Sequence, residues 1–103
     1  MNIDKIEVTE NDRYLEIYPN KNIVIIEGKP YEIKTEDIRE LLRIIRNWDN
    51  AYYSSKGFDG NRFEVVVYSK GEKTIMRGLR KLPDNYDSFV SLVRSIYGRV
   101  WNK

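Results

Sequence analysis

The sequence contains neither cysteine nor histidine among its 103 residues. Without cysteine, a disulfide framework, a thiolate metal site and a cysteine nucleophile are all excluded. The absence of histidine removes the side chain that most often serves as a metal ligand or a general base. We therefore expect neither a metal site nor a cofactor.

Long apolar segments are also missing. The longest apolar run, Ile23–Ile26, is much shorter than a membrane span. Charged residues such as Asp4, Lys5 and Glu7 interrupt the first ten positions, so the apolar core of a secretory signal cannot be drawn there. We expect a soluble, cytoplasmic protein without membrane contact, and the composition would suit a protein that a phage or plasmid makes inside a cell.

The remaining composition is that of one folded domain. Hydrophobic residues make up 41% and charged residues 33%, too apolar for a disordered chain and too polar for a membrane protein. Residues 1–60 carry 9 Lys or Arg and 12 Asp or Glu, whereas residues 61–103 carry 9 and 4. We predict a single α+β domain over residues 1–103 with a basic C-terminal part, which can indicate an acidic partner.

Alternating apolar and polar residues predict short strands in the first half of the chain. Two strands are expected around Ile6–Val8 and Leu15–Ile17. The β-branched run Ile23–Ile26 predicts a central, buried strand, and Tyr31–Ile33 can continue the sheet.

A helix follows, with Thr35 as the predicted N-cap. Apolar residues recur with the spacing of one helical face at Ile38, Leu41, Leu42, Ile45, Trp48 and Tyr52. The helix should end near Asp49, and residues 54–61, rich in Ser, Gly, Asp and Asn, should form the longest loop.

The second half repeats strands and a helix. Phe63–Val67 and Thr74–Met76 predict a hairpin around the turn Ser69–Glu72. Asp84 or Asn85 should begin the second helix, and Gly98 should end it.

These elements predict an α+β fold: an antiparallel sheet with both helices on one face, in the order β-β-(β)-α-β-β-α. Leu15–Ile17 matches Phe63–Val65, and Gly28 matches Gly78, so an internal ββα repeat is one interpretation. The alternative is that any hairpin followed by a helix produces this likeness.

No catalytic arrangement is visible. Glu36 and Glu40 lie on the solvent side of the first predicted helix, opposite Ile38 and Ile45, whereas acid–base catalysis needs carboxylates in a cleft. The segment Asp59–Asn61 lacks the spacing of a calcium loop. No glycine is directly followed by Lys-Ser or Lys-Thr, so no phosphate loop is visible. We predict that the protein is not an enzyme.

Two segments are candidates for binding. The first surrounds the long loop and places aromatic beside basic residues, as base stacking or a protein partner requires: Tyr52, Tyr53, Lys56, Phe58 and Arg62. Alternatively, its aromatic residues border the core.

The second candidate is the hairpin, where five cations lie within twelve residues: Lys70, Lys73, Arg77, Arg80 and Lys81. Alternation places Lys73 and Arg77 on the same side as Ile75. Edge strands also carry lysines to prevent association, which is the structural alternative.

The C-terminal part shows a recurring pattern: Asp59–Val67, then Gly78, then Pro83–Phe89. This D-G-x-x-F-x-V strand, glycine and P-x-N-aromatic helix start resembles short uncharacterised bacterial and phage-borne α+β proteins. The resemblance implies a shared ββα unit and carries no activity.

We therefore expect a small non-enzymatic protein-binding module of the inhibitor, immunity or adaptor type, whose partner is another protein. The alternative is a nucleic-acid-binding protein that uses the basic hairpin and the aromatic loop, although no helix-turn-helix or zinc signature accompanies the charge.

Overall fold

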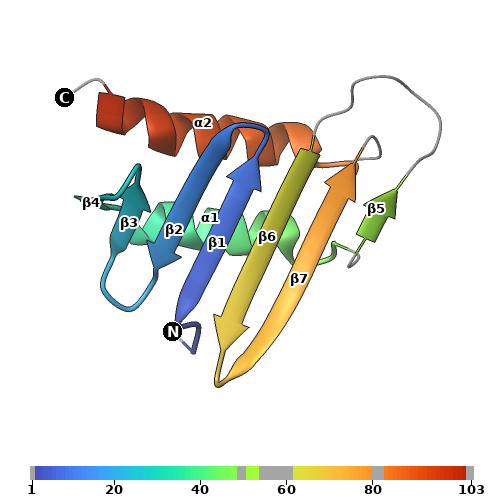
Figure 1. Ribbon diagram of the computed structural model, residues 1–103, viewed down its shortest axis with the longest axis horizontal. Coiled ribbons are helices and arrows are strands. Elements are labelled where there is room, and N and C mark those ends of the chain that lie inside the picture. Colours follow the sequence, from blue (N-terminus) through green and yellow to red (C-terminus); the bar gives the residue numbers. More distant parts are fainter. Residues whose placement is uncertain (1, 49–50, 54–61, 80–82, 102–103) are drawn as a thin grey trace.

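The computed structural model describes residues 2–48, 51–53, 62–79 and 83–101 of the chain. In this part, a seven-stranded sheet carries two helices on one of its faces (Figure 1). The elements follow in the order β1 (Lys5–Glu10), β2 (Arg13–Tyr18), β3 (Ile23–Ile26), β4 (Lys29–Glu32), α1 (Thr35–Ile45), β5 (Ala51–Tyr53), β6 (Arg62–Ser69), β7 (Glu72–Leu79) and α2 (Tyr86–Trp101).

The strands lie side by side in the order β4-β3-β2-β1-β6-β7-β5. All neighbouring pairs are antiparallel except β5 and β7, which are parallel. The α+β class and the order of strands and helices are confirmed. The place of Tyr52 was predicted wrongly, because α1 ends at Ile45 and Tyr52 lies in β5.

The centre of the sheet consists of β1 and β6, whereas β3 lies next to the edge strand β4. The prediction of a central strand at Ile23–Ile26 was therefore wrong, although Val24 and Ile26 are buried. The match of Leu15–Ile17 with Phe63–Val65 equates β2 with β6. The strand order does not test this match, so the internal repeat stays a prediction.

The core lies between the sheet and the helices because alternate side chains of each strand point toward them. Its fully buried members include Ile6, Val8, Leu15, Ile17, Ile38, Leu41, Phe63, Val65 and Phe89. Trp48 follows α1 and packs edge-on against Phe63 and Phe89, with ring centroids 5.0 and 5.1 Å apart. This aromatic contact joins β6, α2 and the end of α1.

Two helix ends differ from the predictions. Lys34, not Thr35, is the N-cap of α1, and the Thr35 hydroxyl accepts a hydrogen bond from Asn22 at 2.8 Å. The second helix continues past Gly98 to Trp101. Asn85 precedes α2, and its side chain donates to the carbonyl of Ile44 at 2.8 Å, which lacks an intrahelical partner at the end of α1.

The hairpin turn between β6 and β7 is confirmed. Ser69 pairs with Glu72 across a two-residue loop whose members, Lys70 and Gly71, have φ angles of 53° and 79°. Positive φ at both positions gives the twist that a tight hairpin requires. The turn therefore fixes the register of the two longest strands.

Candidate functional site

Both described helices lie on one face of the sheet, and neither covers the opposite face (Figure 1). Because side chains alternate along a strand, the neighbours of the buried core residues point to this side. We call this surface the open face; its members are Lys5, Glu7, Thr9, Tyr14, Glu16, Tyr18, Ile23, Ile25, Arg62, Glu64, Val66, Tyr68, Lys73, Ile75 and Arg77.

Hydrogen bonds between tyrosines and glutamates join three strands in the middle of the open face. The Tyr14 hydroxyl donates to one carboxylate oxygen of Glu7 at 2.7 Å, and the Tyr68 hydroxyl donates to the other. The Tyr18 hydroxyl donates to Glu16 at 3.1 Å. Glu7 on β1 thus fixes one ring from β2 and one from β6.

Lys5 completes this arrangement. Its ammonium nitrogen lies 3.7 Å from Glu7 and 3.8 Å from Glu16. It also lies 5.9 and 5.6 Å from the ring centroids of Tyr18 and Tyr68, a distance at which a cation is attracted to an aromatic face. We call the six residues of this arrangement the tyrosine cluster: Lys5, Glu7, Tyr14, Glu16, Tyr18 and Tyr68.

Interactions within the tyrosine cluster shift the pKa values of Glu7, Tyr14 and Tyr68. Hydrogen bonds from Tyr68 and Tyr14, with a smaller contribution from Lys5, lower the pKa of Glu7. The hydrogen bond to Glu7 raises the pKa of Tyr68, and burial together with that to Glu7 raises the pKa of Tyr14. All three pKa values move away from neutral pH, so Glu7, Tyr14 and Tyr68 are poorly suited to proton transfer.

Tyr14 is the part of the cluster most accessible to a partner. At 42% exposure, it is the exposed large hydrophobic side chain of the described residues. Ile25 and Ile75 are partly exposed on the same face. Ile25 lies on β3 next to the strand of Tyr14, whereas β1 and β6 separate Tyr14 from Ile75 on β7. A fixed, exposed aromatic ring on a face that also carries partly exposed aliphatic side chains is typical of a surface that binds another molecule.

The structure separates the residues that the sequence singled out. Lys73 and Arg77 lie on the open face of β7 with Ile75, as predicted. Arg62 is exposed on the same face at the start of β6, and Lys70 is exposed in the turn.

The remaining predicted site residues are not brought together by the described part of the chain. Tyr52 and Tyr53 belong to β5, where only the backbone is described. Lys56, Phe58, Arg80 and Lys81 lie outside the described residues. The aromatic loop therefore stays a prediction.

The sequence analysis did not identify the tyrosine cluster, although Tyr14, Glu16 and Tyr18 alternate with the apolar residues of the strand predicted around Leu15–Ile17. The alternation in β2 showed that these residues share a face. It could not show that Tyr68, more than fifty positions later, faces Lys5 in the register of β1 and β6.

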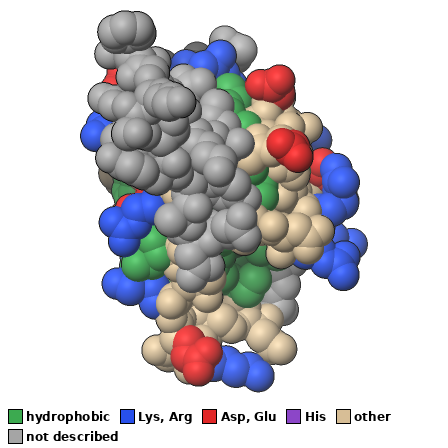
Figure 2. All heavy atoms as spheres, turned by 90° about the vertical axis from the view of Figure 1, so that its right-hand side faces the viewer, with side chains coloured by type: hydrophobic (Ala, Val, Ile, Leu, Met, Phe, Trp, Pro, Cys, Tyr) green, Lys and Arg blue, Asp and Glu red, His purple; other side chains and the backbone are tan. Residues whose placement is uncertain are grey.

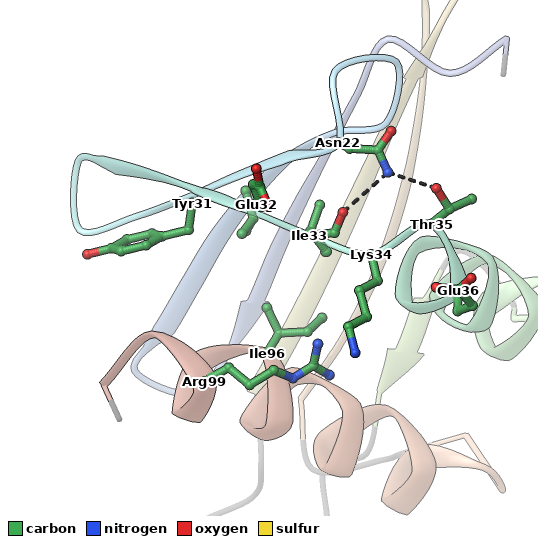
Figure 3. A pocket seen from close by; sticks show the side chains of 10 residues that line it. Asn22, Tyr31, Glu32, Ile33, Lys34, Thr35, Glu36, Ile96 and Arg99 are labelled. Atoms are coloured by element: carbon green, nitrogen blue, oxygen red, sulfur yellow. Dashed lines mark hydrogen bonds between the residues drawn. The ribbon is translucent and has the colours of Figure 1, made fainter. Parts of the chain in front are cut away.

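A cavity of about 500 Å³ opens at one end of the helical layer (Figure 3). Lys34 and Arg99 reach into it, and the carboxylates Glu32 and Glu36 also line it. Arg99 is held by Asp37 at 2.5 Å. The cavity lining thus carries two positive and two negative side chains. This balance gives the cavity no preference for an anionic or a cationic ligand.

One carboxylate lies inside the core. Glu10 has no exposed surface, and it accepts a hydrogen bond from Asn11 at 2.8 Å. The guanidinium groups of Arg13 and Arg94 lie 3.4 and 3.6 Å from its other oxygen. Arg94 belongs to α2, so this ion pair connects the end of β1 to the helix and has a structural role.

The Tyr86 hydroxyl is buried near Glu10. It has no hydrogen-bond partner within the described part of the chain. Burial, followed by the charge of Glu10, raises the pKa of Tyr86 to about 12. A neutral hydroxyl closed off from solvent does not form a reactive site.

Within residues 2–48, 51–53, 62–79 and 83–101, no group of three or more Asp or Glu side chains is placed to hold a metal ion. Neither of the two described helices is long and apolar enough to cross a membrane.

Comparisons with protein-family models, with curated proteins and with solved structures find no match to this chain. The resemblance to short bacterial and phage-borne proteins therefore stays a prediction from residues 59–89.

Proposed function

We propose that this protein is a non-enzymatic binding module of the inhibitor, immunity or adaptor type that binds another protein through the open face. The observation that carries this proposal is the exposed ring of Tyr14, whose hydroxyl is fixed by Glu7 and Glu16 at 2.7 and 3.1 Å. Tyrosine contributes a large contact area at a low cost in conformational entropy when its ring is already held in place.

The charges of the open face favour a protein over a nucleic acid. Carboxylates of Glu7, Glu16 and Glu64 lie among the tyrosines and cations of the face. A polyanion would meet these negative charges wherever it stacked on the rings, whereas a protein partner can offer charges of both signs.

Affinity capture from the host of origin tests this proposal. The Tyr14→Ala variant should lose binding of the captured protein by at least roughly 10-fold in affinity, as expected for a central aromatic residue of an interface. The matched control is Arg43→Ala on α1, whose side chain is exposed and pairs only with Glu40 among the described residues.

Retention of binding by Tyr14→Ala with loss in Arg43→Ala would place the interface on the helical layer and contradict the proposal. Salt-sensitive retardation of mixed DNA and RNA, undiminished in Tyr14→Ala, would instead support the nucleic-acid alternative.

A further inference from the structure

Strand β7 pairs with β6 along its whole length. On its other edge, only the last part of β7 pairs with a described strand, β5. β5 pairs with Arg77, Gly78 and Leu79. Among the strands that the structure describes, none lies beside Glu72–Met76 on that edge. Figure 2 views the molecule from this side, and its coloured part shows hydrophobic side chains together with Lys and Arg side chains.

Along this edge, which we call the free edge, no described strand pairs with the backbone groups of Glu72–Met76. Ser69 and Glu72 close the two-residue turn, and such a closing pair exchanges both hydrogen bonds. Hydrogen-bonded and non-bonded pairs alternate in an antiparallel ladder, so Lys73 and Ile75 turn their N–H and C=O groups away from β6. Arg77 continues the alternation, and its outward groups meet β5.

The charge beside this edge is positive. The Lys73 side chain is exposed on the open face, lies opposite Tyr68 in the register, and forms no ion pair within the described ranges. Lys70 lies in the adjoining turn, where its backbone N–H donates to Asp4 at 3.3 Å. Glu72 points to the opposite side of the sheet from Lys73.

We propose that the Glu72–Met76 edge of β7 binds an extended acidic segment of the partner protein, which adds to the sheet as a further strand. Backbone hydrogen bonds to Lys73 and Ile75 would hold the segment. Side-chain selection follows from the register: an acidic residue opposite Lys73 and an aliphatic residue opposite Ile75. This inference rests on the proposed function and names the chemistry of the partner.

A second copy of this chain is a poorer occupant of the same edge. Two β7 strands paired edge to edge would bring Lys70, Lys73 and Arg77 of one copy next to the same residues of the other. Like charges on neighbouring strands are destabilising, whereas an acidic segment removes the repulsion.

The probe is a capped peptide with the palindromic sequence Thr-Val-Thr-Glu-Thr-Val-Thr, which presents glutamate to Lys73 and valine to Ile75 in either strand direction. The control peptide carries lysine in place of glutamate. At low salt, the glutamate peptide should bind roughly 2- to 5-fold more tightly, the value of one exposed ion pair.

Amide signals in NMR spectra of the full chain locate the peptide. The Lys73 and Ile75 amides should shift and exchange more slowly with solvent when the glutamate peptide is added. The Thr74 amide, which already bonds to β6, serves as the internal control.

Variants separate backbone pairing from side-chain contact. Ile75→Pro removes an outward N–H without breaking the ladder to β6, and should abolish peptide binding; Ile75→Ala keeps the N–H and should retain it. Lys73→Gln should remove the preference for glutamate over lysine, which keeps the proposal testable should Ile75→Pro fail to fold.

Three results would overturn the inference: unchanged Lys73 and Ile75 amides in the presence of peptide, equal binding of the two peptides, or protection of the same amides that rises with protein concentration alone. The last result would identify a second copy as the occupant. If Ile75→Pro binds the captured protein normally while Tyr14→Ala does not, the proposal that the open face binds a protein is retained, and the proposal for the β7 edge fails.

Discussion

The two faces of the sheet are built from the same strands and differ in every second residue. The covered face presents Ile6, Leu15 and Val65 to the helices, all without exposed surface. The open face presents rings that hydrogen bonds hold in place, chiefly Tyr14 and Tyr68. Removal of apolar surface from water stabilises the first face, whereas we propose that the second face uses its fixed, partly exposed rings for recognition. Under this proposal, stability and binding depend on alternate positions of one sheet.

Truncation of a buried ring should give the largest effect. Phe89 packs against Trp48 and Tyr86, with ring centroids 5.1 and 5.6 Å away. Phe89→Ala should lower the free energy of unfolding by about 3–5 kcal/mol in urea denaturation, because a cavity replaces the ring. Tyr14→Ala on the open face should cost less than about 1.5 kcal/mol, mainly its hydrogen bond. Equal losses would show that the faces do not differ in this way.

A carboxylate on the covered face should also contribute more to the free energy of unfolding than one on the open face. Glu10→Gln replaces a buried charge that pairs with Arg13 and Arg94, and should lower the free energy of unfolding by about 1.5–3 kcal/mol. Glu64→Gln on the open face should change it by less than about 0.5 kcal/mol. Thermal or urea unfolding at neutral pH measures the stability of both variants. A larger loss in Glu64→Gln than in Glu10→Gln would contradict the expected difference between the two faces.

Removal of a tyrosine hydroxyl should change the free energy of unfolding in opposite directions in the core and on the open face. Tyr86→Phe removes a buried hydroxyl without a partner in the described residues and should stabilise the protein by about 1 kcal/mol. Tyr68→Phe removes the hydrogen bond to Glu7 and should destabilise it by about 0.5–1.5 kcal/mol. Parallel urea titrations would reveal the sign, and destabilisation by Tyr86→Phe would indicate that its hydroxyl is bound.

The pH dependence of Glu7 should give the smallest effect. Its pKa is lowered from 4.5 by hydrogen bonds from Tyr68 and Tyr14, so the folded state binds its proton less readily than the unfolded state. The resulting stability is present above pH 4.5 and is lost as the pH falls through the lowered value. Between pH 7 and 3, the free energy of unfolding should therefore decrease less steeply in Glu7→Gln than in the wild type. Identical pH dependence in the two proteins would contradict this prediction.

Local patterns in the sequence were enough for much of the fold. Alternation identified Leu15 and Ile17 as core residues, and the turn residues of the β6–β7 hairpin fixed where those two strands meet. Helical spacing likewise placed Ile38, Leu41 and Ile45 on one face of the first helix, and all three are buried. In these segments, propensity, periodicity and burial agree, which is the condition under which local reasoning succeeds.

The missing features depend on contacts between distant segments. β5 has only three residues and exists through its pairing with Arg77–Leu79, so the helical spacing of Trp48 and Tyr52 was misleading. The tyrosine cluster requires β1 to lie between β2 and β6, and no local pattern specifies that order. The free edge of β7 is likewise visible only once the neighbour of each strand is known.

Site-specific photocrosslinking in the host of origin tests the central claim, that the open face binds a protein, most directly. A benzophenone amino acid replaces Tyr14 on the open face or Ser91, an exposed residue of α2, in otherwise identical full-length chains. The account predicts a covalent adduct to one defined protein from position 14 and none from position 91. An adduct from position 91 alone, or nucleic acid as the species crosslinked at position 14, would contradict it.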